Sequence, residues 1–500
     1  MLKKDDIKQL LSLQDALPEL EITSVTEDSR RVKQGSLFVA VQGGHSDGHD
    51  YIADAVASGA VAVLGNEPGY ATMPAGIPYI QHKNPRQAAA LLSHELVGNP
   101  SRSMCVIGVT GTNGKTSTAF LIHHILKQAA FPCAKFGTLG YDLGDKVVAA
   151  PHTTPFGEDL ADLFLQAQKT GMRYVAMEVS SHALAQERVA GIAFNVAAFT
   201  NLTRDHLDFH QTMEAYLQAK RILFERVREA HENGQSEWPC FTVVNYEDLN
   251  AARFMSVLPE QCYTFGEGGQ VTAESVRLRL DGADFVLITP WGTANATISL
   301  VGRHNVLNAL CAVAVCGGLG VPFAAIVSGL ESLACVPGRF EPVAAGEAFQ
   351  VVVDYAHTDD GLRNALHAAR AVCEGRIICV FGCGGDRDSG KRPKMGLVVA
   401  ELADYIVATS DNPRTEDPYR ILLDVEVGLQ RGGKRKHEDY VVIASRREAI
   451  FHAIAQARKG DLVLIAGKGH EDYQIIGTDR IHFDDREQVL EALQERRGAH

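Results

Sequence analysis

Short apolar runs recur along this chain, separated by polar turns that contain glycine or proline. Between residues 104 and 335 the runs alternate with stretches whose apolar residues are spaced three and four apart, as on one face of a helix. This alternation predicts an α/β fold with parallel sheets and crossover helices. After the next join it resumes, with strand-like runs at 349–357, 376–385, 404–413, 439–445 and 461–470.

Two polar, turn-rich joins divide this pattern into three parts. The first join is VGNPSRSM at 97–104, and the second is ACVPGRFEPV at 334–343. They predict three domains, at 1–98, 104–335 and 336–500. A chain of 500 residues is long enough for three domains of ordinary size.

The first of these parts has its own strand and helix signals. Strand-like runs at 36–41 and 60–64 lie on either side of a helical stretch at 51–59. Each run is short and bounded by glycine or polar residues, which is typical of the strands of a small sheet. We therefore expect a small N-terminal α/β domain.

Composition and charge restrict the partners. The net charge of −13 argues against a nucleic-acid partner. The ten cysteines are scattered without a C-x-x-C pair, which favours free thiols in a reducing cytoplasm over a zinc site or a disulfide framework. The first fourteen residues lack the apolar core of a signal peptide.

One uncharged segment has the length of a membrane span. Residues 309–330 carry no charge, but Gly317, Gly318, Gly320 and Pro322 interrupt them. Glycine and proline at these positions predict two buried helices joined by a turn. We therefore expect no membrane insertion.

The motif GTNGKT follows an apolar run and opens a helical pattern. The N–H groups of a glycine turn and of a helix N-terminus suit phosphate oxygens, so we expect Lys115 to contact the outer phosphates and Thr116 a magnesium ion. Val109 stands where the general P-loop pattern has glycine. The motif predicts a central P-loop ATPase domain. The residues assigned to the loop are Gly111, Thr112, Asn113, Gly114, Lys115, Thr116 and Ser117.

Two further strands of the central part are followed by polar residues. These are Glu178, Ser180 and His182 after one strand, and Asp205, His206 and Asp208 after the other. Carboxylate and imidazole groups at adjacent strand ends near a P-loop suit magnesium and phosphate, and we expect this role for Glu178 and His206. For Asp205 and Asp208, capping of a turn or helix explains the residues equally well.

A lysine stands on an apolar helix face shortly afterwards. Met213, Tyr216, Leu217, Lys220 and Phe224 fall on one stripe at helical spacing. A bare ammonium within an apolar face is costly, and such a lysine usually bends its tip to water. Alternatively it reaches a polar site and is chemically altered there. The residues alone leave both interpretations open.

The strands of the last part end in polar, glycine-rich segments. Carboxyl ends of parallel strands line one edge of a sheet, where ligands bind, and this predicts a Rossmann-like C-terminal domain with a site. Arg387 and Arg414 suit carboxylates or phosphates, while Glu471 suits an ammonium. A substrate with both signs of charge, such as an amino acid, fits this edge. The charged residues at the strand ends are Asp354, His357, Asp386, Arg387, Arg414, Lys468, His470 and Glu471.

In combination, the motifs of this chain resemble those of the Mur ligases of peptidoglycan synthesis, and within that family the diaminopimelate-adding branch. The resemblance spans residues 20 to 490. The motifs are GTNGKT, MEVSSH, FTNLTRDHLDFH, GRHNVLNAL, VPGRFE, VDYAHT, FGCGGDRD, DNPR and AGKGHEDYQ.

The resemblance implies a three-domain monomeric enzyme of the cytoplasm. Such an enzyme joins meso-2,6-diaminopimelate to UDP-N-acetylmuramoyl-L-alanyl-D-glutamate. ATP would phosphorylate the D-glutamate carboxylate, and the amine would then attack the acyl phosphate. The implied cofactors are ATP, two magnesium ions and a carbamylated lysine. We further hypothesise that the C-terminal domain closes over ATP when substrates bind.

The resemblance also implies roles for individual residues. Lys115, Glu178, His206 and Lys220 would be catalytic, with Thr116, Glu178, His206 and carbamylated Lys220 holding magnesium. Asn305, Arg339, Asp354 and His357 would complete the nucleotide site. The UDP-sugar dipeptide would contact Ser29, Gly44, His45, Ser46, Thr153, Thr154, Ser180, Gln186 and Arg188. The amino acid would contact Arg387, Asp411, Asn412, Pro413, Arg414, Gly467 and Glu471.

Arg414 would select the substrate. Diaminopimelate has one carboxylate more than lysine, and a guanidinium binds a carboxylate through two hydrogen bonds. Lysine would leave that guanidinium unpaired. Some residues differ from the usual family pattern on the dipeptide side: His152 and Pro155 flank the threonine pair, Ala183 follows SSH, and Glu27 replaces an apolar residue.

Other functions fit parts of the sequence. The enzymatic alternatives are a lysine-adding sibling and another amide-forming ligase such as folylpolyglutamate synthetase, and DNPR with Glu471 argues against both. A P-loop nucleotide switch would leave the strand-end cluster of the last part unexplained. A UDP-sugar-binding pseudoenzyme is opposed by the intact set of lysine, glutamate and histidine.

Overall fold

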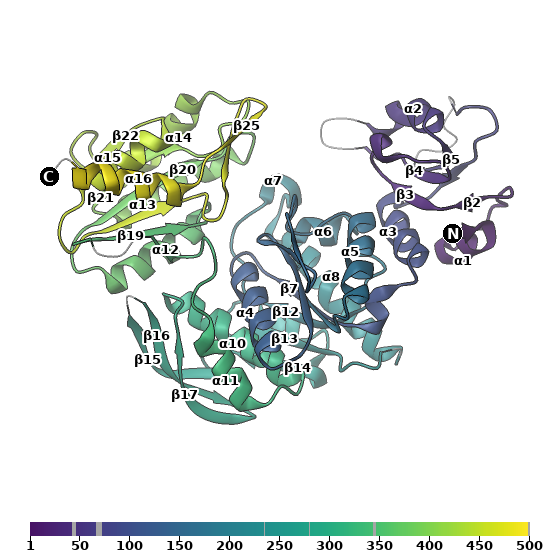
Figure 1. Ribbon diagram of the computed structural model, residues 1–500, viewed down its shortest axis with the longest axis horizontal. Helices are drawn as coiled ribbons and strands as arrows, with labels where there is room; N and C mark the ends of the chain where they lie inside the picture. Colours follow the sequence, from purple (N-terminus) through teal and green to yellow (C-terminus); the bar gives the residue numbers. More distant parts are fainter. Residues whose placement is uncertain (43–46, 67–72, 235, 280, 344–346, 499–500) are drawn as a thin grey trace.

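The computed structural model describes residues 1–42, 47–66, 73–234, 236–279, 281–343 and 347–498. The chain forms three α/β parts, one after another along the sequence (Figure 1). In Figure 1 the N-terminal part is purple, the central part runs from blue to green, and the C-terminal part ends in yellow. The predicted three-domain α/β architecture is confirmed.

The N-terminal part is a four-stranded parallel sheet with helices on both faces. Helices α1 (Lys4–Leu11) and α3 (Pro85–Leu96) pack on one face, and α2 (Ile52–Ala57) packs on the other. The predicted strands and helix of this part are confirmed. A pair of two-residue strands, β1 (Leu2–Lys3) and β2 (Glu21–Ile22), was not predicted. The strands of the main sheet are β3 (Ser24–Thr26), β4 (Ser36–Val39), β5 (Ala60–Gly65) and β6 (Tyr79–Gln81).

The central part contains an eight-stranded sheet in which β8, β11, β7, β12, β13 and β14 run parallel. In sheet order the strands are β10 (Val147–Val148), β9 (Gly140–Asp142), β8 (Cys133–Gly137), β11 (Tyr174–Glu178), β7 (Cys105–Thr110), β12 (Phe194–Phe199), β13 (Phe241–Asn245) and β14 (Cys262–Phe265). Helices α5 (Gly157–Lys169), α6 (Ser181–Ala185), α8 (Met213–Glu232) and α9 (Ala251–Met255) cover one face, and α4 (Lys115–Gln128), α10 (Arg303–Gly318) and α11 (Phe323–Ser332) cover the other.

The segment from β7 to α4 forms the predicted strand, glycine turn and helix. Every residue of β7 is buried, and the turn places Gly111 at φ 153° and Gly114 at φ 84°. A Cβ atom at Gly111 would lie 1.9 Å from the hydroxyl of Thr200, and one at Gly114 would lie 2.3 Å from the amide oxygen of Asn308. Both positions therefore require glycine.

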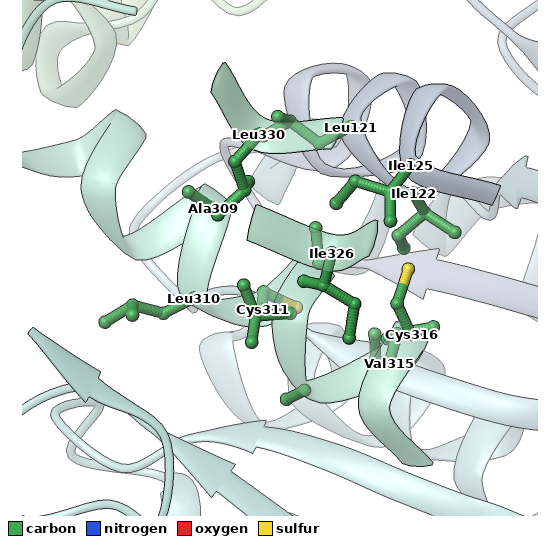
Figure 2. Packing of buried hydrophobic residues seen from close by; sticks show 14 of the residues in the cluster. Leu121, Ile122, Ile125, Ala309, Leu310, Cys311, Val315, Cys316, Ile326 and Leu330 are labelled. Carbon is green, nitrogen blue, oxygen red and sulfur yellow. The ribbon is translucent and has the colours of Figure 1, made fainter. Parts of the chain in front are cut away.

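Two helices joined by a turn, α10 and α11, occur where residues 309–330 predict them. Most of α10 is buried as expected, whereas α11 buries only one face and leaves Ala324 and Ser328 exposed. In Figure 2, Ile326 and Leu330 of α11 face Ile122 and Leu121 of α4, and Cys316 of α10 lies beside them. These side chains are at most 1% exposed. Within the described part of the chain, no helix is long and apolar enough to cross a membrane.

A three-stranded antiparallel sheet departs from the predicted strand–helix alternation of the central part. It consists of β15 (Thr272–Arg279), β16 (Gly282–Thr289) and β17 (Gly292–Ile298). The expectation of uninterrupted alternation up to residue 335 was wrong here. Every residue of β15 is at least partly exposed, so this strand lacks the continuous apolar run by which the buried strands were recognised.

Within the described residues, the C-terminal part contains a six-stranded sheet in which β18 pairs antiparallel with β19 and the other neighbouring strands pair in parallel. In sheet order the strands are β18 (Glu341–Pro342), β19 (Gln350–Asp354), β23 (Leu462–Ala466), β20 (Ile377–Cys383), β21 (Tyr405–Ser410) and β22 (Tyr440–Val442). Helices α12 (Asp359–Val372), α13 (Arg392–Leu402) and α14 (Pro418–Arg431) cover one face, and α15 (Arg446–Gln456) and α16 (Asp485–Gly498) cover the other. The predicted strand endings therefore meet at one edge, beside the hairpin of β24 (Tyr473–Ile476) and β25 (Asp479–His482).

Candidate active site

The glycine turn before α4 holds its lysine close to the backbone. The Lys115 ammonium donates to the carbonyl oxygens of Gly111 (2.9 Å) and Thr112 (2.8 Å). Burial lowers the pKa of Lys115, although the carboxylate of Glu178 acts in the opposite direction. The next hydroxyl, on Thr116, donates to Glu178 Oε2 at 2.8 Å. The turn thus presents a cation and a hydroxyl at the N-terminus of a helix, where phosphate oxygens bind well.

Glu178 is fixed at the end of β11 by neighbouring groups. Its Oε1 accepts from the backbone N–H of Thr138 (2.7 Å), and its Oε2 accepts from the Thr138 hydroxyl (3.2 Å). Glu178 is 2% exposed, and the absence of a side chain at Gly137 makes room for it. The carboxylate is therefore oriented toward the P-loop hydroxyl.

His206 lies after β12, in a loop that leads into the short helix α7 (Leu207–His210). Its backbone is left-handed (φ 54°), its Nε2 is 3.3 Å from Asp205 Oδ2, and its ring lies edge-to-face with that of His182, with ring centres 4.7 Å apart. Burial lowers the pKa of His206 to about 3, so the imidazole is neutral near pH 7. A neutral imidazole can act as a metal ligand.

Lys220 lies on α8 with its ammonium inside the protein. Its side chain is almost completely buried; Nζ donates to the Gly111 carbonyl at 2.8 Å and lies 4.3 Å from the centre of the Tyr216 ring. Among the described residues no carboxylate forms an ion pair with it. Burial, aided by the charge of Lys115, lowers the pKa of Lys220 well below its usual value. The alternative in which the lysine tip bends out to water is wrong.

A cavity adjoins the P-loop on the side of the C-terminal part. Its walls come from the glycine turn, from α10 and from the segment after β19. The structure brings seven of the predicted nucleotide-site residues together in this lining: Asn113, Gly114, Ser117, Asn305, Arg339, Asp354 and His357.

Hydrogen bonds cross this cavity between the central and C-terminal parts. The Arg339 guanidinium donates to the Thr116 hydroxyl at 2.9 Å. Asp360 at the start of α12 accepts from the Asn113 amide (2.5 Å) and from the Thr203 hydroxyl (3.2 Å). Both parts therefore contribute to one site.

The predicted dipeptide residues of the central part form a connected group at the end of β11. Thr154 Oγ1 donates to the Glu178 carbonyl (2.9 Å) and accepts from Ser180 N–H (3.0 Å). Arg188 donates to the Gln186 side chain (2.6 Å) and stacks on the ring of Phe156 at 4.2 Å.

Two of these side chains also have local structural roles. The Ser180 hydroxyl caps α6 by accepting from Ala183 N–H (3.2 Å), and the Thr153 hydroxyl is 3.1 Å from that of Thr138. Ser29, from the N-terminal part, is half-buried in a 3-10 turn. The predicted contacts at Gly44, His45 and Ser46 lie outside the described residues.

The amino-acid site predicted in the C-terminal part has an acidic side. Asn412 donates to Glu471 Oε2 at 3.2 Å, and burial raises the pKa of Glu471. Asp411 lies 3.3 Å from the buried ammonium of Lys468, which also donates to the Asn412 side chain (3.0 Å). Gly467, with φ 123°, carries the chain from β23 into this group.

The basic side of the same predicted site consists of two arginines. Arg414 has a left-handed backbone (φ 51°) and donates to the Gly385 carbonyl at 2.7 Å, while Arg387 donates to the Asp386 carbonyl at 3.2 Å. Burial, reinforced by the charge of Arg414, lowers the pKa of Arg387. Within the described residues, neither guanidinium forms an ion pair. Pro413 is buried between Asn412 and Arg414, in the segment that follows β21.

The prediction omitted residues that the geometry places in these sites. Lys468 was recognised among the strand endings but was left out of the amino-acid contacts. Thr138, Asn308 and Asp360 were not noticed, because their contacts join segments far apart in sequence. Asn308 is the exception, because the sequence did contain a signal for it. It follows Asn305 by three residues and therefore lies on the same face of the helix.

The donor set can be compared with the needs of a metal. In the described residues there is no group of three or more His, Cys, Asp or Glu that could hold an ion. Thr116 and Glu178 nevertheless supply two oxygen donors next to the phosphate loop. Magnesium commonly uses one or two carboxylates and completes its shell with substrate phosphates and water, so these residues fit it.

Three family models match the chain. The Mur ligase middle domain matches residues 109–316, the glutamate ligase domain of Mur ligases matches 338–469, and the catalytic domain of the Mur ligase family matches 21–96. These matches follow the order of the three parts of the fold.

Individual proteins are similar over nearly the whole chain. The UDP-N-acetylmuramoyl-L-alanyl-D-glutamate–2,6-diaminopimelate ligase of Bacillus licheniformis is 44% identical over 477 residues, which cover 95% of both chains. A solved structure of a ligase of that name is 31% identical, with a TM-score of 0.67 over 98% of this chain and 99% of the other. MurF from Thermotoga maritima, solved in complex with ADP, shares the fold at 20% identity, with a TM-score of 0.61 over 94% of this chain and 97% of the other.

Proposed function

Because this chain belongs to the Mur ligase family, we propose that it is the ATP-dependent ligase that adds meso-2,6-diaminopimelate to UDP-N-acetylmuramoyl-L-alanyl-D-glutamate in peptidoglycan precursor synthesis. The single observation that carries the choice of amino acid is the charge arrangement at the C-terminal edge. There, Arg387 and Arg414 have no carboxylate partner among the described residues, while Asp411 and Glu471 lie at the same edge. A substrate with an extra carboxylate and free ammonium groups complements both sides.

The reaction begins with phosphoryl transfer. An oxygen of the D-glutamate carboxylate attacks the γ-phosphorus of ATP, and the bond to the ADP oxygen breaks. Because two anions approach each other, cationic groups must offset their repulsion. Lys115, in the glycine turn, and Arg339, which lines the cavity and donates to the Thr116 hydroxyl, supply positive charge there.

Amide formation follows. The amine of the amino acid attacks the acyl carbon and loses a proton, and inorganic phosphate leaves. The acidic side of the pocket orients one ammonium, and the guanidinium side holds the distal carboxylate. The amine must reach the D-glutamate on the central part, which requires a site shared by the central and C-terminal parts.

We assign magnesium to Thr116 and Glu178, with His206 and Lys220 serving a second ion. When bound, magnesium neutralises charge on the transferring phosphoryl group. For Lys220 we propose carbamylation: the neutral amine nitrogen forms a bond to the carbon of carbon dioxide and loses a proton. The resulting anion suits a metal, whereas the bare ammonium does not. The burial of Lys220 and the lack of an ion-pair partner in the described chain support this assignment.

The remaining assignments follow from the arrangement of the three parts. We propose that residues 1–98 bind the uridine nucleotide of the acceptor, 104–335 bind ATP, and 336–500 bind the amino acid. The dipeptide would extend past Thr154, Ser180 and Arg188. We place the enzyme in the cytoplasm as a monomer, because its ten cysteines are all free thiols and one chain carries both predicted substrate pockets.

The test is phosphate release from ATP in the presence of UDP-N-acetylmuramoyl-L-alanyl-D-glutamate, with meso-diaminopimelate compared with L-lysine. We expect release to require the dipeptide and diaminopimelate, with lysine a poor substrate. A preference for lysine would be consistent with a ligase but would contradict the selecting role of Arg414. Phosphate release that does not depend on the amino acid would favour a nucleotide switch.

A further inference from the structure

Tyr355 lies between the nucleotide cavity and the predicted amino-acid site. It follows the last residue of β19 directly, lines the nucleotide cavity, and directs its hydroxyl to Glu471 in the predicted amino-acid site. None of the roles proposed above uses it. Its two ends therefore contact groups that belong to different substrates.

On the nucleotide side, the face of the ring contacts a cation. The Arg339 guanidinium carbon lies 4.7 Å from the centre of the Tyr355 ring, and the same guanidinium donates to the Thr116 hydroxyl at 2.9 Å. A guanidinium over an aromatic face is attracted by the electrons of the ring. Phosphates that enter the cavity also attract Arg339, and they therefore fix the position of the guanidinium that stacks on Tyr355.

On the amino-acid side, the hydroxyl of Tyr355 reaches a carboxylate. Its oxygen is 3.5 Å from Glu471 Oε1, while Glu471 Oε2 accepts from Asn412 at 3.2 Å. The hydroxyl is thus at the outer limit of a hydrogen bond, and a small shift of the ring makes or breaks this contact. The position of Glu471 therefore depends on the position of Tyr355.

The backbone around Tyr355 is tightly packed. Tyr355 N–H donates to the Gly338 carbonyl at 2.9 Å. A Cβ atom at Gly469 would lie 2.7 Å from Tyr355 Cβ, and one at Gly338 would lie 2.2 Å from the backbone nitrogen of His470. The segment that carries Arg339 and the loop that carries Glu471 therefore touch the backbone of Tyr355, and a displacement of one is transmitted to the other.

We propose that Tyr355 is a positioning residue through which nucleotide in the P-loop cavity strengthens the binding of the incoming amino acid. The ring holds the Arg339 guanidinium at one end, and the hydroxyl holds Glu471 at the other. This inference rests on the proposed ligase function. Coupling of this kind is reciprocal, so the amino acid strengthens nucleotide binding by the same factor.

The test measures binding rather than turnover. The Kd of meso-diaminopimelate is determined by calorimetry on the full chain with UDP-N-acetylmuramoyl-L-alanyl-D-glutamate present, with and without a non-hydrolysable ATP analogue. For the wild type we expect the analogue to lower this Kd by about tenfold, within the usual range of allosteric coupling. We call the ratio of the Kd without the analogue to the Kd with it the coupling factor. Tyr355→Phe keeps the stack on Arg339 but loses the hydroxyl, so the coupling factor should fall to about two. Tyr355→Leu should reduce it to about one.

A matched control removes a similar hydrogen bond elsewhere. The Tyr440 hydroxyl donates to Glu426 at 3.0 Å in the same part of the fold, and neither residue lines the nucleotide cavity or is among the predicted amino-acid contacts. Tyr440→Phe should leave the coupling factor at the wild-type value. The Kd of the ATP analogue alone should be the same in Tyr355→Phe and in the wild type, which separates a positioning role from general damage to the fold.

Two results would overturn the proposal. A coupling factor of one in the wild type would refute the proposal. So would a coupling factor that equals the wild-type value in both Tyr355→Phe and Tyr355→Leu. In both cases wild-type turnover with diaminopimelate would preserve the proposed function. If the wild type neither binds nor uses diaminopimelate, the proposed function and this inference fail together.

Discussion

Lys220 in the central part and Lys468 in the C-terminal part are both removed from solvent, with exposures of 1% and 0%. Their surroundings differ. Lys220 touches a carbonyl and an aromatic ring, whereas Lys468 has Asp411 at 3.3 Å and Glu471 at 3.9 Å. Burial lowers the pKa of both, but near Lys468 the carboxylates oppose that effect. A buried lysine is therefore a reactive amine or a structural cation according to its neighbours.

Among substitutions that test the difference between these two lysines, the largest effect is expected for the activity of a Lys220 variant. Lys220→Ala removes the group proposed to be carbamylated, so we expect kcat to fall by about 100-fold or more. Short-chain carboxylic acids such as acetate should restore part of the activity in a phosphate-release assay, because they supply an anion in the vacated space.

The matched variant for this prediction is Lys220→Arg. It keeps a positive charge, cannot be carbamylated and leaves no space, so carboxylic acids should not rescue it. Mass spectrometry of the wild type in bicarbonate should show one added carbon dioxide at Lys220. Wild-type kcat in Lys220→Ala would contradict the assignment.

The next effect is on stability at Lys468. Lys468→Met leaves Asp411 and Glu471 close together without their shared cation. Loss of one member of a buried charge group costs about 3–5 kcal/mol, and urea unfolding should show a decrease of this size in the free energy of unfolding. The comparable lysine on the surface is Lys436, which pairs with Glu426 at 2.9 Å and is 45% exposed. Lys436→Met should cost less than about 1 kcal/mol.

A third, smaller effect concerns Arg414, whose guanidinium donates to a backbone carbonyl but forms no ion pair within the described residues. Arg414→Lys replaces a guanidinium, which can donate two parallel hydrogen bonds to a carboxylate, by an ammonium, which acts as a point charge. The KM for diaminopimelate should rise by about 10- to 100-fold, and the preference over L-lysine should fall, while the KM for ATP stays constant. Arg420→Lys, on the exposed face of α14, is the control and should change neither value. An unchanged preference in Arg414→Lys would reject its role in selection.

The smallest effect is expected at Glu158, a buried carboxyl group that, like Lys220, has its pKa shifted toward the neutral form by burial. Glu158 on α5 accepts from Glu27 N–H at 3.3 Å at the contact with the N-terminal part, and its Oε2 has no hydrogen-bond partner within the described residues. Burial, reinforced by the charge of Glu27, raises the pKa of Glu158 to about 7. Its neutral form is therefore favoured in the folded state. The stability it contributes is fully present below the unfolded pKa near 4.5 and is lost as pH rises through about 7.

Glu158→Gln fixes that neutral form. We expect a gain of about 1 kcal/mol in unfolding free energy at pH 8 and little change at pH 4.5, measured by urea unfolding at both values. Asp159→Asn is the neighbouring control: Asp159 pairs with Arg31 at 2.8 Å, so it should not gain stability at pH 8. Equal effects of Glu158→Gln at the two pH values would contradict the prediction.

Local pattern was sufficient for much of the fold and for the P-loop. A buried run followed by glycines and an amphipathic helix predicted β7, the turn and α4. The stripe that contains Lys220 was visible because helical spacing is short-range. The sheet of β15 to β17 was missed because its first strand is polar and partly exposed on every residue.

The pairing between segments was not accessible from the sequence. Lys468 was visible among the strand endings, but its contact with Asn412 joins positions 56 residues apart, and only the sheet order places them together. Asp360 was missed for the same reason, since it meets Asn113 across 247 residues. The strand-end rule predicted the edge on which the site lies but not the individual contacts.

The connector between the central and C-terminal parts restricts how the two can turn. Val336 is completely buried in the core of the central part, whereas Gly338 is held against Tyr355 and His470. Only Pro337 lies between these anchors, and its ring fixes its own φ angle. A rotation of the C-terminal part against the central part is therefore limited to the few rotatable backbone bonds next to Pro337. The loop that carries His470 and Glu471 must move together with the C-terminal part in such a rotation.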